Sequence, residues 1–159
     1  MAESSNKKLD AIDKKILENL QKDGRLSLAD LSNEVGLSPS PCLRRLRLLE
    51  KDGIIARYVA VLDQKKAGLP VSVFVSIKLD RQREDALDKF SKAITRWPEV
   101  LECYLMTGPR DYLLRIVVAD VAAYEAFLKQ KLTRLDAIAS IESSFALEQV
   151  KYTNVLPLT

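Results

Sequence analysis

The spacing of apolar side chains changes abruptly near residue 70, and this change constrains the fold more than any other feature. Before it, apolar residues recur every three or four positions, which is typical of amphipathic helices. Directly after it they alternate with polar residues, which is typical of a half-buried strand. We therefore expect two unlike domains, over residues 1–62 and 71–159. The polar stretch 63–70, with Gly68 and Pro70, is expected to link them.

The first domain is expected to be helical, with one strand at its end. Asp10 and Ser27 are suitable N-caps, and Gly36 stands where a tight turn between helices needs a permissive backbone. The predicted elements are helices over about residues 10–22, 28–35 and 39–52 and a strand over 54–62. Residues 28–47 thus have the anatomy of a helix-turn-helix, and the strand would form a wing beside it.

The third predicted helix carries a polar face suited to DNA. Small hydroxyl residues near its start allow close approach to phosphate, and the free N–H groups of a helix N-terminus favour anions. Arginines bridge phosphates or pair with guanine in the major groove. The alternative is a helical bundle whose arginines are merely solvated, and Arg45 could instead pair with Glu50 or Asp52. The candidate DNA contacts are Ser38, Ser40, Pro41, Arg44, Arg45 and Arg47.

The distribution of charge agrees with a polyanionic partner for the first half only. Residues 1–66 contain thirteen basic and ten acidic side chains, whereas the remaining residues contain twelve of each. All of the net charge of +3 therefore lies in the N-terminal half.

The second domain is expected to alternate strands and helices in the order β-α-β-β-α-β, the ferredoxin-like arrangement of an α+β fold. Its strands are expected around residues 71–79, 101–105, 112–118 and 141–147. Both helices should cover one face of the antiparallel sheet, which leaves the other face bare. A second copy of the chain is the simplest cover, so we expect a homodimer.

Composition argues against catalysis, metal binding and a membrane location. The chain has no histidine, which removes the usual general base and the commonest metal ligand. An enzyme would depend on Cys103, expected to point inward from its strand, with no base near it in sequence; Cys42, like Cys103, is expected to be reduced and structural. No signal peptide or membrane span is recognisable, so we expect a cytoplasmic protein with no catalytic residue, metal or cofactor.

Three runs of sequence resemble the leucine-responsive/asparagine-synthase regulator (Lrp/AsnC) family of transcription regulators. They are LDAIDKKILENLQKDGR, GRLSLADLSNEVGLSPSPCLRRLRLLEKDGII and ECYLMTGPRDYLLRI, and the similarity covers roughly residues 8–152. The resemblance implies a winged helix-turn-helix, a ferredoxin-like effector domain, dimers that assemble into octamers, and an amino-acid effector such as leucine, methionine or another apolar amino acid. The sequence departs from the family pattern at Leu48, often polar, and at Asp136–Ala137, commonly Pro-Gly.

The segment from Thr107 to Tyr112 has two interpretations. On its residues alone an ordinary hairpin turn is favoured, because Gly-Pro-x-Asp is good turn chemistry, although the loop also offers the two signs of charge that a zwitterionic amino acid needs. The resemblance instead implies an effector loop, in which Asp111 would receive an ammonium group and Arg110 or backbone N–H groups a carboxylate. Ser144 of a partner chain, near Ser143, would complete the pocket. The candidate effector-binding residues are Thr107, Gly108, Pro109, Arg110, Asp111, Tyr112 and Ser144.

Together these features predict a DNA-binding transcription regulator that senses an amino acid. The competing hypothesis of an assembly or ligand-buffering protein without DNA binding leaves the arginines of the third helix unexplained.

Overall fold

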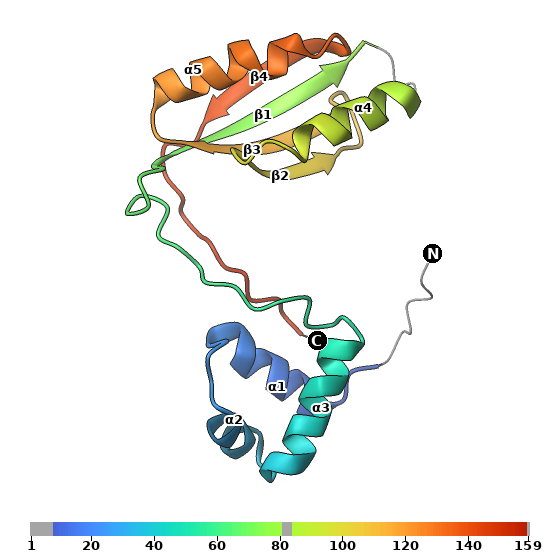
Figure 1. The fold of residues 1–159 in the computed structure, drawn as a ribbon, viewed down its shortest axis with the longest axis vertical. Helices are drawn as coiled ribbons and strands as arrows, with labels where there is room; N and C mark the ends of the chain where they lie inside the picture. Colours follow the sequence, from blue (N-terminus) through green and yellow to red (C-terminus); the bar gives the residue numbers. More distant parts are fainter. Residues whose placement is uncertain (1–7, 81–83, 159) are drawn as a thin grey trace. The chain divides into compact units, whose positions relative to one another are not determined.

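The computed structural model describes residues 8–80 and 84–158 and divides the chain into two compact units. The first unit comprises Met1–Val61 together with Lys151–Thr159, and the second comprises Leu62–Val150 (Figure 1). The chain therefore passes from one unit to the other twice. The first seven residues of the expected DNA-binding domain, and the final residue of the expected effector domain, lie outside the described residues.

The first unit contains the three predicted helices, α1 (Ala11–Lys22), α2 (Leu28–Val35) and α3 (Pro39–Lys51). Both predicted N-caps are confirmed. Asp10 Oδ1 accepts from Asp13 N at 2.8 Å, and Ser27 Oγ accepts from Asp30 N at 3.1 Å. Gly36 ends α2 with a positive φ of 72°, a conformation that glycine adopts without steric cost. Local capping and turn chemistry therefore determine where these helices begin and end.

One apolar cluster holds the three helices together. Ile16 of α1, Leu31 of α2, and Cys42 and Leu49 of α3 are at most 1% exposed. Burial of each large aliphatic side chain stabilises the unit by roughly 1.5–3 kcal/mol. Cys42 is a free, buried thiol, as expected for a structural cysteine. This packing fixes the angle at which α3 presents its outer face.

The strand predicted over residues 54–62 is wrong. All nine residues are described, and they belong to no helix or strand. The N–H groups of Ile54 and Ile55 both donate to Leu49 O and close the end of α3. Val59 and Val61 are exposed. A β-branched sequence favours an extended backbone, but a strand also needs a neighbour for its N–H and C=O groups, and the apolar pattern does not identify one.

The second unit has the predicted α+β order. Its elements are β1 (Val71–Leu79), α4 (Glu84–Ile94), β2 (Val100–Leu105), β3 (Tyr112–Val118), α5 (Val121–Gln130), a short 3₁₀ turn (Leu132–Arg134) and β4 (Ile138–Phe145). The antiparallel strands are ordered β2-β3-β1-β4. Helices α4 and α5 lie over the same face of this sheet (Figure 1). The ferredoxin-like prediction is confirmed.

The alternation in β1 separates the two faces of the sheet. Val73, Val75 and Ile77 are fully buried beneath the helices, together with Leu114 of β3, which pairs with Val75. Phe74, on the opposite face, is exposed. One face of the sheet therefore builds the core, and within the described residues no helix covers the other.

Two expectations for the outer strands need correction. Pairing with Leu114 places Cys103 on the helix side, but β2 is an edge strand and Cys103 is exposed rather than packed inward. The fourth strand ends at Phe145, not at Leu147. Its pairing with β1 ends at Val73 and Phe145, and the next residue, Ala146, adds one further bond from its N–H to Ser72 O. Alternation sets the side of the sheet that a residue faces, but burial depends on how far the helices reach.

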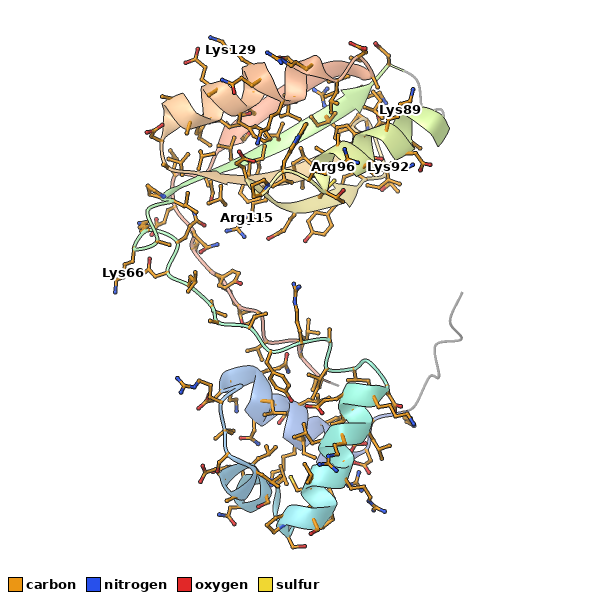
Figure 2. All side chains as sticks on the ribbon, in the orientation of Figure 1. Lys66, Lys89, Lys92, Arg96, Arg115 and Lys129 are labelled. Atoms are coloured by element: carbon orange, nitrogen blue, oxygen red, sulfur yellow. The ribbon has the colours of Figure 1, made fainter. Side chains whose placement is uncertain are left out.

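The turn over residues 63–69 is fastened to β1 and β3. Gln64 Nε2 donates to Leu69 O at 2.6 Å and to Ser72 Oγ at 3.0 Å. Arg115 of β3, labelled in Figure 2, donates to Gln64 Oε1 at 3.1 Å and to Glu102 Oε1 at 2.9 Å. Residues of the expected linker are thus held by specific hydrogen bonds to the second unit.

Candidate DNA interface and effector loop

The outer face of α3 presents uncommitted polar side chains. Ser40, Arg44 and Arg47 follow one another at intervals of four and three residues, which places them on one side of the helix, and all three are exposed. Among the described residues, none makes an ion pair with Arg44 or Arg47. Both guanidinium groups therefore keep their donors available for phosphate or base edges.

The first turn of α3 offers hydroxyl groups more than backbone N–H groups. Pro39 and Pro41 carry no N–H, so Ser40 is the single donor among the first three helical residues. Ser38 occupies the N-cap, but its side chain makes no capping hydrogen bond within the described residues, and it is exposed. The expectation of several free N–H groups is therefore corrected. This helix start can receive an anion through Ser40 N–H and two serine hydroxyls.

Arg45 lies on a different side of α3 and is engaged inside the first unit. Its Nη1 donates to Asp10 Oδ2 at 2.7 Å and to Asp13 Oδ1 at 2.8 Å, and the Asp13 side chain is buried. The suggested pairing with Glu50 or Asp52 is wrong, because Arg45 faces the start of α1. The two carboxylates raise the pKa of Arg45 above its usual value. Arg45 joins α3 to α1, whereas Arg44 and Arg47 face outward.

Leu48, where the family pattern is often polar, is 39% exposed. It lies on α3 beside Arg47 and packs only partly against the rest of the unit. It therefore adds a partly exposed apolar side chain next to the basic face.

The predicted effector loop is held at its base by Asp111. The Asp111 side chain is 4% exposed; its Oδ2 accepts from Leu79 N at 2.7 Å, and its Oδ1 lies 3.4 Å from Lys78 Nζ. Asp111 N donates to Ile77 O, and Asp111 O accepts from Met106 N. The sequence analysis did not identify Lys78. This residue lies on β1, and the antiparallel pairing of β1 with β3 brings it beside Asp111. Asp111 thus closes the hairpin against β1.

The other loop residues are of two kinds: some are exposed, and others already contact residues of the second unit. Thr107, Gly108 and Pro109 are exposed, and Gly108 has a φ of 105° with open space on the side where a Cβ would stand. Arg110 donates to Ser140 Oγ at 2.7 Å and to Glu142 Oε2 at 2.6 Å, both on β4. Tyr112 belongs to the core, with its ring 4.4 Å from that of Phe90.

Ser144 is not brought to this loop within one chain. It pairs with Phe74, whereas the loop adjoins Ile77, three residues further along β1 and about 10 Å away at ~3.3 Å per residue. Its neighbour Ser143 shares a hydrogen bond with Tyr124 at 2.5 Å. The Asp136–Ala137 loop also supports the sheet, because Ala137 O accepts from Asp80 N at 2.9 Å.

The described residues contain no group of three or more side chains suited to hold a metal ion, and no described helix is long and apolar enough to cross a membrane. Partial burial raises the pKa of the Cys103 thiol, which lowers its thiolate fraction and its reactivity.

Family models match both units. Residues 9–56 match a winged helix-turn-helix DNA-binding model, and residues 72–156 match the Lrp/AsnC ligand-binding domain. The Bkd operon transcriptional regulator of Pseudomonas aeruginosa is 48% identical over 150 residues, which cover 94% of this chain and 98% of that protein. The leucine-responsive regulatory protein of Haemophilus influenzae is 44% identical over 158 residues, which cover 99% of this chain and 95% of that protein.

Solved structures agree with these matches. A transcriptional regulator from Neisseria meningitidis, in complex with L-methionine, is 41% identical with a TM-score of 0.90, covering 94% of this chain and 97% of its own. An AsnC family transcriptional regulator from Agrobacterium tumefaciens is 48% identical with the same TM-score of 0.90 and the same coverage of both chains. The chain therefore belongs to the Lrp/AsnC family of DNA-binding transcription regulators, which are not enzymes, and combines a winged helix-turn-helix with an amino-acid ligand-binding domain.

Proposed function

We propose that this chain binds specific DNA sites through α3 and that an apolar amino acid, such as leucine or methionine, changes its DNA binding or its assembly. The uncommitted face of α3 carries the DNA half of this proposal, because its arginines and serines have no partner among the described residues. The effector half is supported by the relative named leucine-responsive and by the related structure in complex with L-methionine.

In this proposal each residue of α3 has a distinct task. Ser38 and Ser40 bind a phosphate at the helix start, and this contact positions α3 across the groove. Pro41 rigidifies that first turn. Arg44 and Arg47 reach base edges or flanking phosphates, where a bidentate pair with guanine contributes about 1–3 kcal/mol of discrimination. Arg45 acts indirectly: its bonds to Asp10 and Asp13 hold α3 at the correct angle.

The effector is proposed to bind at the loop from Thr107 to Tyr112. An ammonium group would compete with Lys78 for Asp111 Oδ1, which lies 3.4 Å from Lys78 Nζ. The carboxylate would bind Arg110 or the N–H groups beside Gly108. An open hollow of about 240 Å³ adjoins this region, because Ser140, which Arg110 contacts, is one of its lining residues. Its other lining residues are Thr133, Leu135, Ile138, Ala139 and Ile141.

Assembly is proposed to complete the effector site. The uncovered sheet face carries exposed Phe74, and a second copy would bury it and form a homodimer. Ser144 lies on this face beside Phe74, so the partner's Ser144 would line a pocket between chains. Association of such dimers would give the octamer that the family resemblance implies. A regulator of this kind would act in the cytoplasm, where the DNA is.

A thermal-shift screen of the twenty amino acids tests the effector, because a ligand that binds only the folded state raises the melting temperature. We expect an apolar amino acid to give the largest shift. A gel-shift titration on genomic fragments, with and without that amino acid, then tests regulation. Flat melting curves for all twenty would contradict the effector proposal. The absence of a shift with every fragment would favour the assembly or ligand-buffering alternative.

A further inference from the structure

The C-terminal segment returns to the helix-turn-helix. Lys151–Thr159 belong to the same compact unit as α1, α2 and α3, although they follow the effector domain in sequence. Leu156 N donates to Gln21 Oε1 at 2.6 Å, and Gln21 Nε2 donates to Leu156 O at 3.3 Å. One side-chain amide of α1 therefore satisfies both polar groups of a single residue in the segment. Such a reciprocal pair fixes the register of the segment on the helix.

An apolar contact accompanies this pair. Leu158 is partly buried and packs against the core cluster of the three helices, the cluster that contains Ile16 and Leu31. By contrast, the side chain of Leu156 is 68% exposed, so this residue is held through its backbone. The segment thus combines a backbone anchor at Leu156 with a side-chain anchor at Leu158.

The route between the two units gives this contact a functional meaning. Directly after β4, Ala146 N donates to Ser72 O at 3.0 Å, whereas Leu147 and Val150 are almost fully exposed. Beyond them the chain is held again at Leu156. The residues in between lead from β4, which carries the proposed effector residue Ser144, to α1 of the DNA-binding unit. A change at β4 therefore has a covalent path to the helix-turn-helix separate from the linker.

We propose that residues 155–158 are an integral part of the DNA-binding unit, bound to α1 through Gln21 and to the apolar cluster of the three helices through Leu158, and that this second connection transmits the effector state to DNA binding. The first half stands on the contacts alone, and the second half rests on the proposed effector function. Its printed hydrogen bonds go to Gln21 of α1, so its task is to restrain that helix rather than to contact DNA.

Amide hydrogen exchange on the full-length protein tests the docking. The Leu156 amide should exchange at least tenfold more slowly than the exposed amides at 148–150, because it donates to Gln21. Gln21→Ala should abolish this protection. Leu158→Ala should reduce it and lower the melting temperature of the DNA-binding unit by about 3–8 °C. Leu156→Ala is the matched control, since its backbone bonds remain and its side chain is exposed. An unprotected Leu156 amide in the wild type would overturn the docking.

Gel shifts with and without the amino acid found in the melting screen test the coupling. Without effector, we expect Gln21→Ala and Leu158→Ala to bind DNA within about threefold of wild type. The factor by which the effector changes DNA affinity should fall toward one in both variants. Leu156→Ala should keep the wild-type factor. An unchanged factor in both anchor variants would overturn the second half of the proposal. If no amino acid alters DNA binding by the wild type, the effector function and the coupling fall together, while amide exchange still judges the docking separately.

Discussion

The outer face of α3 and the loop from Thr107 to Tyr112 both carry charged residues suited to a ligand, but they differ in what those residues already do. Arg44 and Arg47 are exposed and make no ion pair with the described residues. In the loop, Asp111 is buried against Leu79 N and Lys78, and Arg110 is bound to β4. The arginines of the α3 face make no ion pair with the described residues, whereas the loop's charges are already paired with residues of the neighbouring strands.

This difference has an energetic consequence. A free guanidinium gives up only water when it binds phosphate, so its contribution to binding is little reduced by internal competition. A charge that is already paired must exchange one partner for another, and the net gain is smaller. The loop therefore needs a ligand with both signs of charge, or a partner chain, before exchange is favourable. A zwitterionic amino acid meets this requirement.

The largest effect is expected at Asp111. Asp111→Ala leaves the buried Leu79 N–H without this acceptor, which should destabilise the second unit by about 1–3 kcal/mol and weaken effector binding roughly a hundredfold. Asp111→Asn keeps a side-chain oxygen for Leu79 and should recover much of the stability, but not the effector affinity. Calorimetry and thermal melting measure the two effects, with exposed Asp88→Ala as the control. Wild-type effector affinity in a folded Asp111→Ala protein would remove Asp111 from the site.

The next effect is expected on the outer face of α3. Arg44→Ala or Arg47→Ala should each weaken operator binding by about 1–3 kcal/mol if the arginine reads a base. If it contacts only phosphate, specificity should survive and the salt slope should fall by about one. Gel shifts at several salt concentrations measure both, with exposed Arg134→Ala of the second unit as the control. Unchanged affinity and slope in both variants would show that α3 does not read DNA.

A smaller effect of a different kind is expected at Arg45. Arg45→Ala removes the link to Asp10 and the buried Asp13, so it should lower the stability of the first unit by about 1–2 kcal/mol. Any loss of DNA affinity should then be similar for specific and unrelated sequences, because the residue holds α3 and does not read bases. Denaturant unfolding, followed beside gel shifts, separates the two. A selective loss of specificity at full stability would make Arg45 a direct contact after all.

The same ion pairs predict how stability responds to acid. The Asp13 backbone N–H, and next the Arg45 guanidinium, hold the pKa of Asp10 below its usual value of 3.8. The contribution of ionised Asp10 to the stability of the first unit is therefore present above its usual pKa, and it is lost as the pH falls through the lowered pKa. The melting temperatures of the wild type and of Arg45→Ala should be measured between pH 5 and pH 2. The melting temperature of the mutant should fall less steeply with acid than that of the wild type. Equal slopes would indicate that Arg45 does not act on Asp10.

The smallest effect on stability is expected at Arg110. Its pair with Glu142 lies at the surface, where such ion pairs are worth about 0–1 kcal/mol. Arg110→Ala should therefore melt within about 3 °C of the wild type, in contrast to Asp111→Ala. Its effector affinity should nevertheless fall, if the guanidinium binds the carboxylate. A large destabilisation would mean that Arg110 supports the loop in the way that Asp111 does.

The sequence by itself determined the features that depend on neighbouring residues. Helical and alternating spacing located three helices and the buried β1, and the caps at Asp10 and Ser27 set helix starts correctly, because a cap bonds to an N–H only three residues away. The order of elements was enough to predict the ferredoxin-like sheet. The polar face of α3 was also predictable, since helical periodicity alone places Arg44 and Arg47 together.

Only the tertiary structure decided which distant groups meet. Arg45 is bound to residues 32 and 35 positions away, Asp111 to Leu79 and Lys78 across a strand pair, and Gln21 to Leu156, which is 135 positions away. The strand expected over 54–62 failed for the same reason, because strand formation requires a partner that local pattern does not name. Periodicity tells which side of an element a residue faces, but a polar group's partner is set by packing between elements, and that packing separates a free arginine from a structural one.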